Sequence, residues 1–167
     1  AGIRKAGSGL IGSEMKPERA RRVKFAIAET DFDEGRYGTA IERLNAVAME
    51  YPASPQGDES VHLVLESYRT LNDYLGLIRA GRRFLDSASP IAQKIKDEIA
   101  PIVRSAEQHQ LDELALAAAA VDGSDVTGDL EKFAKDYSGT DLGERALINA
   151  LLAARAAGDS DGVYRLA

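Results

Sequence analysis

Cysteine and tryptophan are both missing from this chain of 167 residues. Without cysteine there can be no disulfide framework, no thiolate metal site and no thiol nucleophile. The redox compartment stays open, because a cysteine-free chain tolerates either environment. Aromatic residues make up only 6% of the sequence, and runs of β-branched residues are scarce. Alanine, leucine, glutamate and arginine are abundant instead, and this mixture favours helices.

Long apolar stretches are also lacking. No run approaches the ~20 residues that a membrane-spanning helix requires, and no signal peptide is visible. We therefore expect a soluble globular protein. A length of 167 residues is enough for one domain with a sizeable core.

The net charge of −6 is unevenly distributed. Residues 1–24 contain seven basic and two acidic side chains, so this segment carries about +5 and the remainder about −11. An acidic body argues against nucleic acid as the main partner, because phosphate binding requires a basic face. Residues 1–16 are rich in glycine and lack periodicity, so we expect a basic arm or linker. We expect a solvated tail; docking on an acidic protein or an anionic membrane surface is the alternative, and other membrane contact would be indirect.

Two amphipathic segments follow the arm. Pro17 suits the first turn of a helix, and apolar residues at spacings of three and four predict a helix from about 17 to 34. Gly35 ends this helix, and Pro52 closes a second helix of about four turns. Because only a few residues separate the two helices, we expect antiparallel neighbours. The first stripe contains Phe25, Ala28 and Phe32, and the second contains Tyr37, Ala40, Ile41, Leu44, Val47, Ala48 and Tyr51.

The pattern then returns. Ser54-Pro55 suits an N-cap followed by proline at the first helical position, and Ser89-Pro90 repeats this pair 35 residues later. Between these points two further stripes predict another helix pair, with Asn72-Asp73-Tyr74 at its turn. The stripes contain Val61, Val64, Leu65, Tyr68 and Leu71, then Leu77, Ile78, Phe84 and Leu85.

A third copy aligns without a gap at a shift of 86 residues, so that Tyr51 corresponds to Tyr137 and Gly57 to Gly143. The segment before this copy is longer than one unit by about a helix. The last copy stops within its second helix, so we expect a piece of a longer protein. The units span about 17–53, 54–88, 89–139 and 140–167, the last of them incomplete.

The extra helix falls within residues 91–121. An apolar stripe keeps its phase there across Pro101, although an interior proline costs about 3 kcal/mol and usually kinks or breaks a helix. We favour one long kinked helix of roughly 30 residues, ended by Gly123. Two helices broken near Pro101 are the alternative. The stripe contains Ile91, Ile95, Ile99, Ile102, Ala106, Leu114 and Val121.

Helix pairs with a period near 34 residues are typical of tetratricopeptide repeats. The second unit departs from this family at Leu77, where a small residue is expected, and at Gly81. The resemblance implies an all-α fold, a right-handed superhelix of antiparallel helix pairs in which the first helix of each pair lines the concave side. The first unit resembles the family in Ala28, Gly35-Arg36-Tyr37, Ala40-Ile41, Leu44, Val47 and Pro52.

The stretch GRYGTAIERLNAVAMEYPASP, followed by Asp58-Glu59-Ser60, is similar in particular to tetratricopeptide units of bacterial envelope scaffold proteins. Outer-membrane barrel-assembly lipoproteins and Tol-Pal coordinators are of this kind. They have no catalytic activity, so the resemblance implies a protein that holds other envelope proteins. It implies a periplasmic or outer-membrane-associated location; a cytoplasmic location is the alternative.

Nothing in the sequence compels catalytic or metal chemistry. Glu59-x-x-His62 matches half of a di-metal pattern in which helices contribute Glu-x-x-His pairs, and Glu66 lies one turn beyond. The second pair is missing, since Ala106 stands three residues before His109, so we expect a surface ion pair. We predict no catalytic residue, no cofactor and no metal; a metal-binding helical protein is the weaker alternative.

The sequence instead predicts a surface that binds other proteins. Polar side chains on the first helix of each pair that point away from the core are the candidates. They would hold a peptide together with a few apolar anchors. The main hypothesis is a non-enzymatic interaction scaffold, and the alternative is a structural subunit of a larger complex with no free peptide ligand. The candidates are Arg22, Glu29, Asp33, Glu59, His62, Glu66, Arg69, Arg145 and Arg155.

Overall fold

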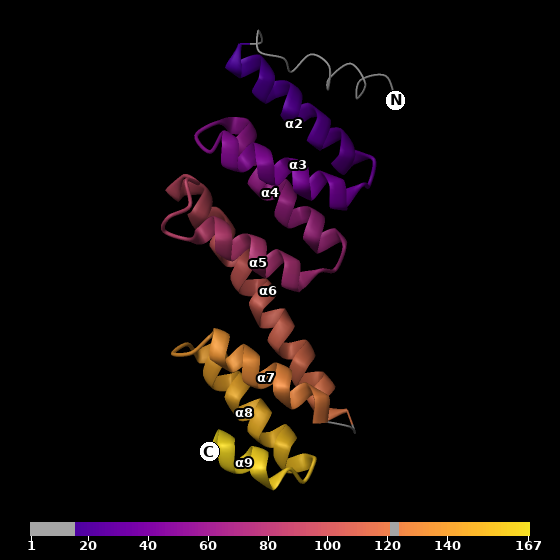
Figure 1. Cartoon of the computed structure of the whole chain (residues 1–167), viewed down its shortest axis with the longest axis vertical. Coiled ribbons are helices and arrows are strands. Elements are labelled where there is room, and N and C mark those ends of the chain that lie inside the picture. Colours follow the sequence, from indigo (N-terminus) through magenta and orange to yellow (C-terminus); the bar gives the residue numbers. More distant parts are fainter. Residues whose placement is uncertain (1–15, 121–123) are drawn as a thin grey trace. The chain divides into compact units, whose positions relative to one another are not determined.

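A computed structural model describes residues 16–120 and 124–167, and in these ranges all regular secondary structure is helical (Figure 1). The all-α class is therefore confirmed. No helix of the described ranges has the length and apolar character needed to cross a bilayer. The predicted arm lies outside the described residues apart from Lys16, as do Val121 and Gly123. The helices are α2 (Pro17–Asp33), α3 (Tyr37–Glu50), α4 (Pro55–Thr70), α5 (Tyr74–Leu85), α6 (Gln93–Ala119), α7 (Ser124–Asp136), α8 (Asp141–Ala156) and α9 (Ser160–Leu166).

The chain forms two compact units, residues 1–106 and 107–167, and α6 continues from one into the other. In the first unit α2 packs against α3 and α4, while α4 also packs against α3 and α5. In the second unit α8 packs against both α7 and α9. These helices thus bury their apolar stripes against neighbours in the sequence.

The turn within a helix pair has the same hydrogen bonds at three places along the chain. After α2, the Gly35 N–H donates to the Phe32 carbonyl at 2.9 Å, and the following N–H donates to the Asp31 carbonyl at 2.8 Å. This Schellman motif requires a left-handed residue just past the helix, and Gly35 supplies it with a φ of 73°. Asn72 and Gly158, with φ of 54° and 71°, repeat the motif after α4 and α8.

The connection that leads into the next pair also repeats. At the start of α4, the Ser54 Oγ accepts a hydrogen bond from the Gly57 N–H at 3.1 Å and donates one to the Tyr51 carbonyl at 2.7 Å. Thr140 makes the equivalent bonds at the start of α8, at 3.2 and 2.7 Å. A Cβ on Gly57 would lie 2.1 Å from the Tyr51 oxygen, and one on Gly143 would lie 2.2 Å from the corresponding oxygen. The predicted correspondence at a shift of 86 residues therefore extends to backbone geometry.

The core of the first unit consists largely of the predicted stripes. Leu71, which was predicted in the stripe of α4, is instead 50% exposed, because it lies just past the end of that helix. Leu44, Val64 and Phe84 are fully buried, and full burial of such a side chain contributes about 1.5–3 kcal/mol. Ala28 and Ala40 are fully buried in the same cluster. These small side chains leave room for close contact between helices.

A buried carboxylate fastens α2 to α3. Asp31 is 1% exposed; its Oδ1 accepts a hydrogen bond from Arg36 Nε at 2.8 Å, and its Oδ2 accepts one from Arg43. A carboxylate is tolerated in such a place only when charged partners and hydrogen bonds compensate for the lost water. The two arginines, one in the turn and one on α3, provide that compensation.

Residues 93–119 form the single helix α6 with Pro101 inside it, in agreement with the favoured prediction of one helix. The helix does not begin directly after Ser89-Pro90, as the repeat of Ser54-Pro55 suggested. Lys96 instead extends its Nζ back to the carbonyls of Asp86 and Ser89, at 2.6 and 3.2 Å. These bonds hold the preceding residues as a loop.

The buried stripe of α6 also differs from the predicted one. Val103 is 2% exposed and Leu111 is fully buried, whereas Ile102 is 38% exposed. The reason lies on α5, where a Cβ on Gly81 would approach Val103 Cγ2 to 2.2 Å. Gly81 thus lets α6 come close to α5 and draws Val103, rather than Ile102, into the core.

The second unit has a core with smaller side chains. Leu111 of α6 and Leu130 of α7 are fully buried. Phe133 stacks on Tyr137 with ring centroids 4.1 Å apart. The buried residues of α8 are all small: Gly143, Ala146, Ala150, Ala153 and Ala154.

Candidate protein-binding site

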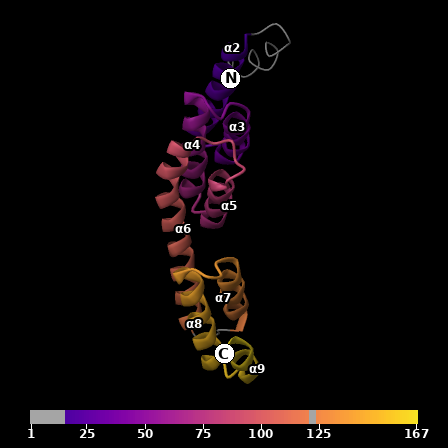
Figure 2. The ribbon, with the colours of Figure 1, turned by 90° about the vertical axis from the view of Figure 1, so that its left-hand side faces the viewer.

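A groove of about 270 Å³ opens between α4 and α6 in the first unit. These two helices lie on the same side of the unit, with α3 and α5 on the other side (Figure 2). The groove therefore lies between the first helices of successive pairs, where the binding surface was predicted. Its lining residues are His62, Leu63, Leu65, Glu66 and Arg69 of α4 and Ile102 of α6.

Charged side chains form the rim of this groove. His62 Nε2 lies 3.2 Å from Glu98 Oε2 across the two helices, and Lys94 Nζ lies 3.7 Å from Glu98 Oε1. Arg69 Nη2 lies 2.7 Å from Glu66 Oε2 on the same helix. All of these side chains are at least one-third exposed, and exposed pairs contribute about 0–1 kcal/mol. Because the pairs are weak, a partner can exchange them for its own charges at little cost.

Apolar side chains form the floor. Leu65 belongs to the core, and Leu63 packs against that core while half-buried. Ile102 is 38% exposed in the described structure, because Val103 takes the inward position on α6. A half-exposed isoleucine beside a half-buried leucine offers the apolar anchor that peptide recognition uses.

The structure brings three of the predicted site residues together, namely His62, Glu66 and Arg69. Glu59 lies on the same helix but is exposed and does not line the groove. The sequence reasoning missed Glu98 and placed Ile102 in the core. Three other candidates are exposed along α2, outside the groove: Arg22, Glu29 and Asp33.

The remaining candidates, Arg145 and Arg155, lie on α8 in the second unit. Arg145 Nη1 donates to Gln108 Oε1 of α6 at 2.6 Å, and its Nη2 lies 3.4 Å from Asp112 Oδ1. Arg155 is exposed. Two residues that sequence reasoning did not select, Ile148 and Leu152, lie between these arginines on α8. They are 56% and 57% exposed, and their helical spacing together with the arginines could have indicated a shared face.

The half-pattern for a metal takes another form in the structure. The carboxylate nearest to His62 comes from Glu98 on α6, and within residues 16–120 and 124–167 no three potential ligands gather around one point. His109 pairs instead with Glu113 one turn along α6, at 3.4 Å. Both histidines thus lie within hydrogen-bonding or contact distance of an exposed glutamate carboxylate.

No known protein family, characterised protein or solved structure gives a significant match to this chain.

Proposed function

We propose that the chain is a non-enzymatic protein–protein interaction scaffold, built from tetratricopeptide-like helix pairs that stack as a right-handed superhelix. Support comes from the three copies of the Schellman turn and the two copies of the capped connection. The capped connection leads into α4 and into α8, and recurring connections of this kind are typical of repeat architectures. The residue pattern of the first unit supports the same architecture.

The α4/α6 groove is the binding site in this proposal, and the observation that carries it is the exposed Ile102 next to exchangeable ion pairs from two helices. A partner segment would place an apolar side chain against Ile102 and Leu63. An acidic group of the partner would meet Arg69, and a basic group would meet Glu66 or Glu98. Such a combination of anchor and rim is the usual arrangement at protein interfaces.

Peptide display against the immobilised chain, followed by fluorescence anisotropy with selected peptides, tests this site. We expect Ile102→Asp to weaken peptide binding at least tenfold, because it removes the anchor and adds charge to the floor. Leu71→Asp is the matched control, since Leu71 is also exposed (50%) but does not line the groove. We expect this control to change affinity less than twofold.

Two results would refute the proposed groove. One is a set of selected peptides whose affinities fall equally in both variants. The other is nuclear magnetic resonance mapping in which a peptide shifts signals outside α4 and α6. Circular dichroism of each variant distinguishes loss of binding from loss of folding.

A structural subunit of a larger complex is the second candidate, and Ile148 and Leu152 favour it. Exposed aliphatic side chains one helical turn apart suit a permanent interface better than an exchangeable one. Photo-crosslinkers at positions 148 and 102 in the natural host discriminate the candidates. Crosslinking of one stoichiometric neighbour at position 148 alone favours the subunit, whereas crosslinks at position 102 favour the peptide-binding scaffold.

For the compartment, we infer a periplasmic or outer-membrane-associated protein of a bacterial envelope assembly. The resemblance of residues 35–55 to envelope scaffold units supports this inference. Fractionation of the natural host followed by immunoblotting tests it. Recovery of the protein with the cytoplasmic fraction would contradict it.

A further inference from the structure

A second pocket of the first unit lies between α3 and α5. Its volume is about 280 Å³, and its lining includes Asn45 of α3, Tyr68 of α4, and Gly76, Arg79 and Arg83 of α5. Figure 2 shows α3 and α5 on the side of the unit away from α4 and α6. This pocket is therefore separate from the α4/α6 groove.

Two guanidinium groups line this pocket without a carboxylate. Arg79 and Arg83 are one turn apart on α5, and both are exposed. Arg83 donates to the neutral Asn45 Oδ1, and within the described ranges neither arginine makes an ion pair. Like charges at this spacing destabilise a helix slightly. The Asp73 carboxylate near the start of α5 accepts a hydrogen bond from the Gly76 N–H at 2.7 Å, as a helix cap.

The second unit has a partly equivalent arrangement in which several of the lining residues differ. At the shift of 86 residues, Asn45 corresponds to Glu131 and Arg79 corresponds to Arg165. Arg165 Nη2 lies 2.6 Å from Glu131 Oε1, and this hydrogen bond raises the pKa of Arg165. The position that carries a carboxylate bonded to Arg165 in the second unit therefore carries an uncharged amide in the first, and that amide bonds Arg83 rather than Arg79.

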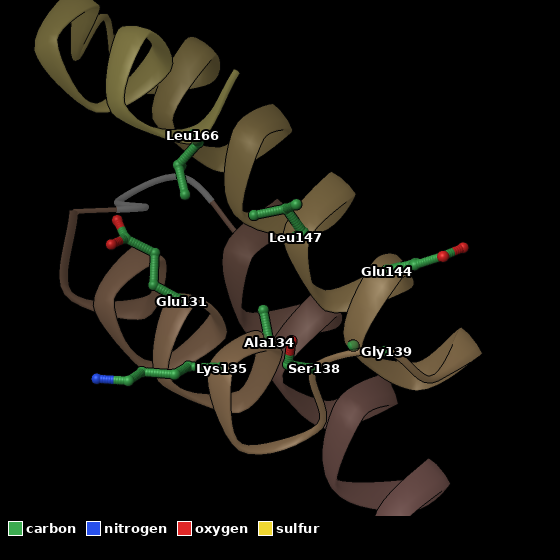
Figure 3. Close-up of a pocket in the computed structure, with 9 residues that line it drawn as sticks. Glu131, Ala134, Lys135, Ser138, Gly139, Glu144, Leu147 and Leu166 are labelled. Carbon is green, nitrogen blue, oxygen red and sulfur yellow. The ribbon is translucent and has the colours of Figure 1, made fainter.

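Figure 3 shows the surroundings of this carboxylate in the second unit. Glu131 projects from α7 beside Leu166 of α9, and Lys135 lies one turn further along α7. Leu166 corresponds to Ala80 in the first unit. The pocket between α3 and α5 thus combines two guanidinium groups that have no carboxylate partner among the described residues, a small side chain at this position and a volume of about 280 Å³.

We propose that the pocket between α3 and α5 binds a carboxylate of a partner polypeptide, an aspartate or glutamate side chain that takes the place of Glu131 in the other unit. The planar guanidinium presents paired N–H donors that match a carboxylate bidentately, and two of them here face one pocket. Charge attraction to this pair of arginines favours an acidic segment over a neutral one.

Nuclear magnetic resonance titration of the full chain with an acetylated triglutamate amide tests this proposal, with triglutamine as the uncharged control. We expect saturable shifts of the Arg79 and Arg83 Nε–H signals and of the Gly76 amide with triglutamate only. Asn45→Glu places a carboxylate inside the pocket. We expect it to move the Arg79 signal without peptide and to weaken triglutamate binding at least fivefold. Ser105→Glu adds the same charge at an exposed position of α6, outside the pocket. It should change triglutamate binding less than twofold.

Each contrary result overturns the assignment. Equal shifts with triglutamine would show that charge is not recognised, and an unchanged affinity in Asn45→Glu would show that binding occurs elsewhere. Inorganic phosphate is the third probe: saturable shifts with phosphate but none with triglutamate would make the pocket a phosphate site instead. Signals of His62, Glu98 and Ile102 report the α4/α6 groove in the same spectra, so failure of either site is seen separately.

Discussion

Helices α4 and α8 begin with the same cap and end in the same turn, yet they present different chemistry on equivalent faces. His62 and Glu66 of α4 correspond to Ile148 and Leu152 of α8. The first two make polar contacts with partly exposed charged side chains, Glu98 and Arg69, and the other two are exposed aliphatic side chains. The backbone geometry of the repeat therefore does not determine what a face binds; the residues at these positions do.

The buried faces of α4 and α8 also differ, and here the larger apolar side chains belong to α4. Val64 of α4 is replaced by Ala150 of α8, and both are fully buried. Helix α4 thus buries larger apolar side chains than α8, whereas α8 exposes more of its apolar side chains. Since burial of apolar area is the main stabilising term, we expect the first unit to open less often than the second in native-state hydrogen exchange.

The largest expected effect on stability comes from adding a methyl group at the capped connection that precedes both α4 and α8. Gly57→Ala places a Cβ against the Tyr51 carbonyl oxygen, and Gly143→Ala repeats this in the second unit. We expect each variant to lose about 1–3 kcal/mol of unfolding free energy, as for overpacked sites. Chemical denaturation measures the loss, and hydrogen exchange shows which unit carries it.

Two helical glycines with open space around the Cβ position are the matched controls. Gly38 lies on α3 and Gly128 on α7, with no atom within 4 Å of the added methyl group. Alanine there should stabilise each unit by up to about 1 kcal/mol, because glycine is the poorer helix former. If all four variants behaved alike, the steric account of the connection would be wrong.

The second-largest expected effect concerns the buried carboxylate of the first unit, which has no counterpart 86 residues later. Asp31 corresponds to Ala117, so the second unit has no carboxylate at that position. Asp31→Asn removes the charge that Arg36 and Arg43 compensate, and we expect a loss of about 2 kcal/mol. Protection against hydrogen exchange should fall in α2 and α3 and stay unchanged in α8. Equal losses in both units would refute a local role for Asp31.

The helix pairs of the described structure could be predicted from the sequence because their signals are local. Pro17, Gly35 and Ser54 mark helix ends through their own backbone chemistry, and the apolar spacings mark the buried faces. The register of 86 residues also follows from sequence alone, and the matching caps of α4 and α8 agree with it. Such features depend on few residues and little on the rest of the fold.

The site could be predicted only in part. His62, Glu66 and Arg69 share a face by spacing, so sequence reasoning selected them together. Ile102 and Val103 lie three and four residues after Ile99, and spacing alone cannot decide which one is buried. The decision depends on Gly81 of another helix. Contacts of this kind arise from tertiary packing, and a single sequence carries no signal for them.

The smallest expected effect is a pH dependence confined to the first unit. Lys24 Nζ lies 2.5 Å from Glu50 Oε2; this bond lowers the pKa of Glu50 and raises the pKa of Lys24. The stability it contributes is present above the usual pKa of a glutamate and is lost as pH falls through the lowered pKa of Glu50. On the alkaline side, the same stability is lost as pH rises through the raised pKa of Lys24.

Glu50→Gln tests this pair. The difference in urea midpoint between the unaltered chain and the variant should be greatest near neutral pH and vanish on acidification, because the protonated carboxyl resembles the amide. Lys24 corresponds to Gln110, and Glu50 to Asp136, so Asp136→Asn in the second unit is the matched control and should show no such profile. A difference that stays constant from neutral to acidic pH would mean that Glu50 acts through packing, since a charge pair with these pKa shifts cannot survive protonation of its acid.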